Sequence, residues 1–161
     1  MTIPLSLLQN IQNQSSKEAW KAIFHFLQTE FFNSLETLEE NLDLRNERIQ
    51  KDQLVGNIDF YLASAAWDLW LSYDSDVPHT AKKLVQWWKE QKRGRAILIL
   101  DGLSISEAPS ILRGLKKHHY QIHQTSITGA ELPPETNTFA KAFGFQQLSK
   151  LENNLAFNPT S

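Results

Sequence analysis

The chain has 161 residues, of which 41% are apolar and 21% are charged, and its formal net charge is −2. This length allows one domain with a core or a small domain plus an appendage, and the charge supplies no general attraction for nucleic acid or an anionic membrane. The sequence has no cysteine, which excludes disulfides, thiolate zinc sites and cysteine nucleophiles.

Residues 1–94 are predicted to form a helical segment. Ser15-Ser16-Lys17-Glu18 is a capping-box pattern, and the apolar residues that follow it recur at helical spacing. The last helix of this segment is expected to begin near Pro78 or Thr80 and to end before Gly94. The predicted helices cover residues 15–38, 54–69 and about 80–93, with a short additional helix over 4–13.

The pattern changes at residue 95. Residues 96–100 are a continuous apolar run, which is typical of a strand buried on both faces of a parallel sheet. A helix is expected over 106–117, a second strand over 119–127, a loop over 128–135 and a short helix over 137–143. We therefore predict an α/β fold, in which residues 95–147 form a partial parallel βαβ unit and 148–161 form a polar tail.

Two residues of this unit carry candidate chemistry. Asp101 follows the first predicted strand, where open α/β sheets place their ligands, and a carboxylate is a suitable ligand for a divalent cation. Thr136 is expected to cap the last helix, where its hydroxyl would lie among free backbone N–H groups that favour a phosphoryl oxygen. A threonine hydroxyl becomes a useful nucleophile only when a metal ion or a base activates it.

Residues 97–144 resemble the PglZ domain of the alkaline phosphatase superfamily. The resemblance depends on Ile99-Leu100-Asp101-Gly102-Leu103, on Leu132-Pro133-Pro134-Glu135-Thr136 and on Ala142-Phe143-Gly144. It implies an alkaline-phosphatase-like domain in which Asp101 binds one of two metal ions, usually zinc. It also implies that Thr136 is the catalytic nucleophile and bridges both ions. Pro134 stands where the family loop often has its first threonine.

The resemblance also implies that further metal ligands would lie beyond residue 161. We therefore expect the N-terminal portion of a PglZ-like protein that is catalytically inactive alone, with a role in binding or assembly, in settings such as phage defence. One alternative is a metal-dependent phosphoester hydrolase whose missing ligands come from a partner chain. Another is a helical protein-interaction module in which the βαβ unit is only a scaffold.

Other patterns have simpler explanations. Asp101, Ser104 and Ser106 approximate the Asp-x-Ser-x-Ser motif of adhesion-type metal sites, but their spacing is one residue too long. His119 and His123 have the i, i+4 spacing of a helical zinc site, yet they straddle a predicted helix–strand boundary. We interpret both histidines as exposed polar residues.

The sequence gives only general indications of the binding partners and the cellular compartment of the protein. Six basic residues between positions 82 and 95 alternate with Trp87 and Trp88, and we interpret them as a solvated helix face rather than a nucleic-acid groove. Residues 1–10 lack the basic region and apolar core of a signal peptide, and no apolar run approaches the roughly 18 residues of a membrane span. We expect a cytoplasmic protein whose partner is another protein or the remainder of its own domain.

Overall fold

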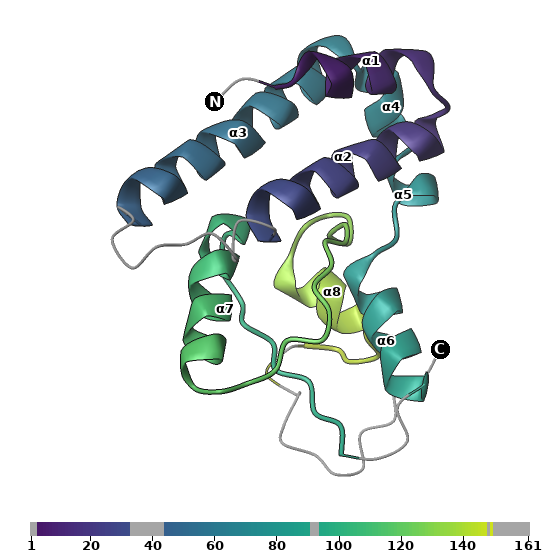
Figure 1. Cartoon of the computed structure of the whole chain (residues 1–161). Coiled ribbons are helices and arrows are strands. Elements are labelled where there is room, and N and C mark those ends of the chain that lie inside the picture. The colour runs from purple at the N-terminus through teal and green to yellow at the C-terminus, as the bar shows by residue number, and fades with distance from the viewer. Residues whose placement is uncertain (1–2, 33–43, 91–93, 148, 150–161) are drawn as a thin grey trace. The chain divides into compact units, whose positions relative to one another are not determined.

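The structure is a computed structural model that describes residues 3–32, 44–90, 94–147 and 149 (Figure 1). It divides into two compact units, which we call the first unit (Met1–Asp76 with Gly102–Ile127) and the second unit (Val77–Asp101 with Thr128–Ser161). The first unit holds α1 (Leu5–Asn13), α2 (Ser16–Phe32), α3 (Leu44–Ala65), α4 (Trp67–Leu71), α5 (Tyr73–Asp76), the 3₁₀ helix η2 (Ile105–Glu107) and α7 (Ala108–Lys117). The second unit holds α6 (Thr80–Glu90) and α8 (Thr136–Ala142).

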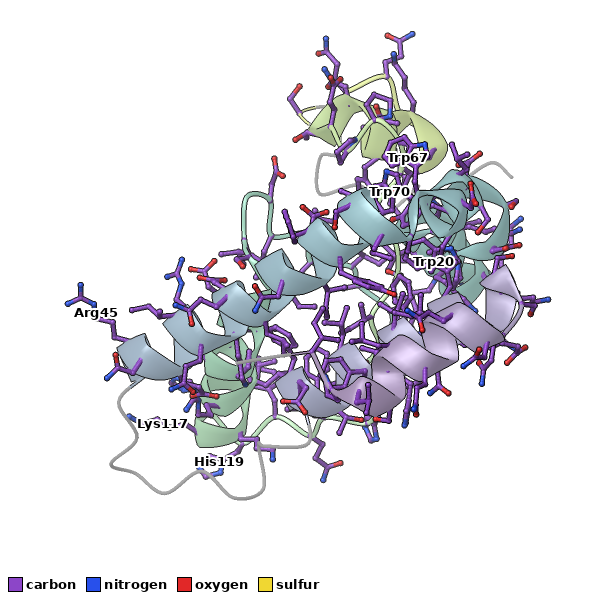
Figure 2. The ribbon with its side chains drawn as sticks, turned by 90° about the horizontal axis from the view of Figure 1, so that it is seen from above. Trp20, Arg45, Trp67, Trp70, Lys117 and His119 are labelled. Carbon is purple, nitrogen blue, oxygen red and sulfur yellow. The ribbon has the colours of Figure 1, made fainter. Side chains whose placement is uncertain are left out.

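The two long helices of the first unit both contribute apolar side chains to its core. Helices α2 and α3 run alongside one another in both Figure 1 and Figure 2. Buried apolar residues include Ile23 and Phe31 of α2 and Leu54, Ile58 and Leu62 of α3. Leu54, Ile58 and Leu62 recur every four positions, and Ile23 and Phe31 are eight positions apart, so each helix buries residues of one apolar stripe, which stabilises this unit.

An aromatic cluster connects α2 with the short helices α4 and α5. The rings of Trp20 and Tyr73 meet edge to face with their centroids 5.3 Å apart, and the centroid of the Trp70 ring lies 5.1 Å from that of Tyr73. Figure 2 labels Trp20 and Trp70. The indole N–H of Trp20 donates to the hydroxyl of Ser72 at 3.0 Å. The cluster thus buries a large apolar area and still satisfies the polar group of the tryptophan.

Ionic contacts connect α3 with α7 in the same unit. The Glu47 carboxylate lies 2.8 Å from Lys51 Nζ and 3.4 Å from Arg113 Nη2. Lys51 is only 7% exposed, and its ammonium group lies 5.3 Å from the centroid of the Phe31 ring. A buried ammonium group needs such partners because its desolvation costs several kcal/mol, on the order of 5.

The predicted parallel βαβ unit is not formed, so the predicted α/β fold class is wrong for the part of the chain that the structure describes. Residues 96–100 and 119–127 join no β-ladder there, and the described residues contain an isolated bridge between His79 and Gly129 instead. The two predicted strands also belong to different units. A pair of short strands gains too little from mutual pairing to form a sheet without further neighbours, so local apolar character did not suffice.

Several predicted helices are confirmed, although their ends differ. Helix α2 begins at Ser16, and residues 33–38 of the predicted helix lie outside the described residues. The predicted helix over 54–69 is instead the end of the longer α3 followed by α4, with a break at Ala66. All of the predicted tail except Ser149 also lies outside the described residues. Among the helices described, none is both long and apolar enough to cross a membrane.

Candidate functional site

The second unit is organised around the N-terminus of α6. The segment 128–131 lies against it through a parallel bridge between His79 and Gly129. The Thr80 N–H donates to the Gly129 carbonyl at 3.0 Å, and the Gly129 N–H donates to the Pro78 carbonyl at the same distance. The hydroxyl of Thr80 contacts that of Thr128 at 2.7 Å. These bonds satisfy backbone groups that the start of a helix would otherwise leave without partners.

A buried carboxylate completes this docking. Glu131 is 8% exposed, and its Oε1 accepts the backbone N–H of Ala81 at 2.7 Å. A carboxylate at this end of a helix satisfies a free donor and also interacts favourably with the helix dipole. Sequence reasoning missed Glu131 because the signal for it is long-range: fifty residues separate it from the N–H group that it accepts.

The loop after Glu131 leads directly into α8. Glu135 occupies the N-cap position in extended conformation, and its carbonyl accepts the N–H groups of Thr138 and Phe139. Thr136 is therefore the first residue of the helix rather than the cap that the sequence suggested. Its hydroxyl is consequently available for a partner outside its own helix.

That partner is the other predicted site residue. The Thr136 hydroxyl donates to Oδ2 of Asp101 at 3.1 Å, and both residues are exposed to solvent and belong to the second unit. The structure thus brings together the two residues that the sequence singled out, although they stand 35 positions apart. We call this contact the Asp101–Thr136 pair.

The residues around the Asp101–Thr136 pair do not fit the zinc site that the resemblance implies. A catalytic zinc ion typically has three protein ligands, and a two-metal site needs more. The described ranges contain no group of three or more His, Cys, Asp or Glu side chains that could hold a metal ion. The pair offers one carboxylate and one hydroxyl, which is a ligand set for weak cation binding only.

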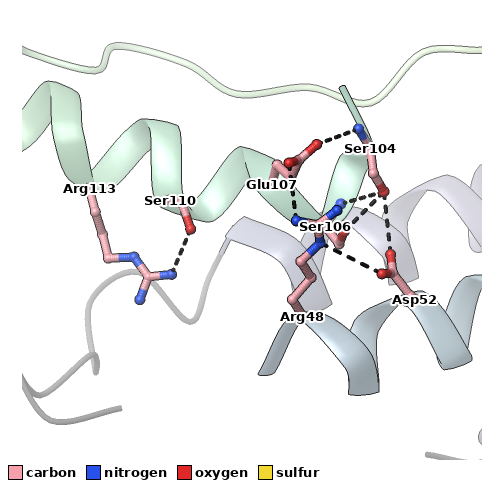
Figure 3. Close-up of polar contacts among 7 residues, drawn as sticks. All are labelled: Arg48, Asp52, Ser104, Ser106, Glu107, Ser110 and Arg113. Atoms are coloured by element: carbon pink, nitrogen blue, oxygen red, sulfur yellow. Dashed lines mark hydrogen bonds and ion pairs between the residues drawn. The ribbon is translucent and has the colours of Figure 1, made fainter. Parts of the chain in front are cut away.

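The serines after Asp101 are engaged in helix capping. The hydroxyl oxygen of Ser104 accepts the Ser106 N–H at 3.3 Å, and the Ser104 N–H donates to the Glu107 carboxylate at 2.9 Å. Ser104 and Glu107 therefore form a capping box at η2 (Figure 3). The Ser104 hydroxyl also donates to Asp52 of α3 at 3.3 Å, and Arg48 lies 3.2 Å from Glu107. These hydroxyls therefore contribute to the packing of η2 on α3, within the first unit.

The two histidines considered as zinc ligands lie beyond the end of α7. His119 follows the helix with a φ of 63°, a left-handed conformation that ends the helical turn (Figure 2). His123 lies in the irregular segment that follows, and both side chains are exposed. The i, i+4 relationship that would place both rings on one helix face is consequently absent.

Comparison of the chain with protein-family models, with curated proteins and with solved structures finds no match. The assignment of chemistry to the second unit therefore depends on its own residues.

Proposed function

We propose that the protein is a PglZ-like chain that acts in binding or assembly and does not hydrolyse phosphate esters by itself. The observation that carries this proposal is the hydrogen bond of 3.1 Å between Thr136 and Asp101. The proposal depends on this contact between two motifs and not on the fold, since the predicted βαβ unit is not formed.

The chemistry of the Asp101–Thr136 pair supports inactivity of the chain alone. A threonine hydroxyl attacks phosphorus efficiently only when a metal ion or a strong base removes its proton. Here the hydroxyl donates to a single exposed carboxylate, which is also the one strong cation ligand of the pair. Two ligand side chains, both solvated, bind a divalent ion too weakly to sustain such a mechanism.

Hydrolysis assays on the full chain test the proposal. Phosphomonoester and phosphodiester substrates would be incubated with zinc or manganese and with the wild-type chain, Thr136→Ala or Asp101→Asn. Thr138→Ala, on the same helix but outside the pair, is the matched control. We expect all four proteins to give the rate of the metal ion alone. Metal-dependent turnover by the wild-type chain and by Thr138→Ala, but not by Thr136→Ala, would overturn the proposal.

A second candidate is a phosphate-ester hydrolase that a partner chain completes. The exposure of both Asp101 and Thr136 favours it, because a second polypeptide could reach them. That partner would have to supply the remaining metal ligands. Activity that arises only in a mixture of the two chains, and that Thr136→Ala abolishes, is the expected result for this candidate.

A further inference from the structure

The apolar run over residues 96–100 lies outside regular secondary structure and is partly exposed. Its side chains alternate: Ala96, Leu98 and Leu100 are exposed, whereas Ile97 and Ile99 are half-buried. Leu98 is 83% exposed and Leu100 is 51% exposed. This period of two is that of a β-strand with one face covered and one face in solvent. Within the described residues, the run joins no β-ladder.

Such a segment is a template for strand pairing. Exposed strands are normally protected by a proline, by charges within the strand or by a bulge, and residues 96–100 have no such protection. The charges stand only at its two ends, as Arg95 and Asp101. Outside them, Gly94 (φ 62°) and Gly102 (φ 74°) turn the backbone away from the extended conformation at both ends.

The order of these residues makes the segment complementary to itself in the antiparallel direction. With Leu98 opposite Leu98 of a second copy, Ile97 lies opposite Ile99 and Ala96 lies opposite Leu100. In the same register Arg95 lies opposite Asp101, and this opposition occurs twice because the arrangement has a two-fold axis. Parallel in-register pairing would instead place Arg95 beside Arg95 and Asp101 beside Asp101, which is unfavourable.

We propose that residues 95–101 bind a second copy of this chain as an antiparallel two-stranded ribbon centred on Leu98. The exposed Ala96, Leu98 and Leu100 of both copies then form one continuous apolar stripe, while Ile97 and Ile99 keep their half-buried positions. Seven residues on each copy bury much less surface than a standard interface, which buries about 800 Å² per partner. The dimer is therefore weak and concentration-dependent.

Sedimentation of the full chain over roughly a hundredfold range of concentration measures this equilibrium. Leu98→Lys places two like charges face to face at the two-fold axis, and we expect it to raise the dissociation constant at least about tenfold. Leu71→Lys is the matched control, because Leu71 is 69% exposed but lies on α4 of the first unit. We expect that variant to dimerise like the wild type.

A charge exchange tests the register. Arg95→Glu and Asp101→Arg each place two like charges opposite one another in their own homodimers, whereas a mixture of the two variants restores opposite charges at both positions. We expect each variant alone to lose dimer and the mixture to recover it. Because Arg95 also contacts the Trp88 ring within its own chain, circular dichroism of each variant checks that the fold is retained. A wild-type chain that stays monomeric overturns the proposal and points to a strand of a different protein. A dimer that Leu98→Lys leaves intact, or a mixture that shows no recovery, overturns it as well.

Discussion

The Glu131 carboxylate accepts the Ala81 N–H at 2.7 Å and so connects the 128–131 segment with the first turn of α6. Because the carboxylate is buried, water cannot replace it without rearrangement of the segment. This bond, together with the bridge at Gly129, positions the loop that leads to Thr136. The geometry of the candidate site therefore depends on a residue that takes no part in it.

Loss of this carboxylate is expected to weaken the start of α6. Glu131→Ala leaves the Ala81 N–H buried without its acceptor, which costs about 1–3 kcal/mol. Amide hydrogen exchange at Ala81 should accelerate by roughly fivefold to a hundredfold, since a factor of ten corresponds to about 1.4 kcal/mol. Glu131→Gln retains an acceptor oxygen and should show a smaller effect. Glu135→Ala, which removes an exposed side chain without a capping bond, is the control.

The contact of Glu47 with the buried Lys51 should contribute far more to the free energy of unfolding than an exposed ion pair of similar length. Glu47→Ala removes the partner 2.8 Å from the nearly buried Lys51, and we expect a loss of about 3 kcal/mol in the free energy of unfolding. Glu18→Ala breaks an exposed pair of 2.6 Å with Lys21 and should cost less than about 1 kcal/mol. Urea unfolding compares the two variants, and equal losses would contradict the role of burial.

Acid sensitivity is expected at Asp76. The Ser16 hydroxyl, 2.6 Å away, holds the pKa of Asp76 below its ordinary value, and Ser72, Ser75 and Lys17 lower it further. The folded chain therefore binds fewer protons at this carboxyl than the unfolded chain does near pH 4. The resulting stabilisation is complete above the ordinary pKa of about 3.9 and is lost as the pH falls through the lowered value.

A titration of the Asp76 carboxyl carbon by NMR checks this assignment. Ser16→Ala removes the strongest hydrogen bond and should raise the pKa toward its ordinary value. Ser75→Ala removes a contact of 3.4 Å and should raise the pKa less. The reverse order would show that Ser16 is not the main cause.

The Asp101–Thr136 hydrogen bond should contribute little to stability. Both side chains are exposed, so water replaces each partner readily, and we expect a coupling free energy below about 1 kcal/mol. A double-mutant cycle with Asp101→Ala and Thr136→Val measures it. A coupling well above this value would mean that the pair is more deeply desolvated than its exposure indicates.

Local patterns in the sequence determined much of the helical structure. The sequence predicted the start of α2, the start of α6 near Thr80 and the end of α7. Capping residues and apolar spacing that indicate these positions involve neighbours only a few residues apart, so they can be recognised without the fold. The sequence also selected Asp101 and Thr136 as a pair, and the structure places them in hydrogen-bonding contact. Their metal-binding and nucleophilic roles remain predictions.

Tertiary structure alone decided whether the two predicted strands form and which residues position the candidate site. Whether residues 96–100 become a buried strand depends on neighbours that an apolar run does not encode, and here Leu98 remains in solvent. The bond from Ala81 to Glu131 spans fifty positions and has no local signature. Secondary structure within a helix follows from contacts between close neighbours, whereas sheet formation and the capping of α6 follow from contacts between distant ones.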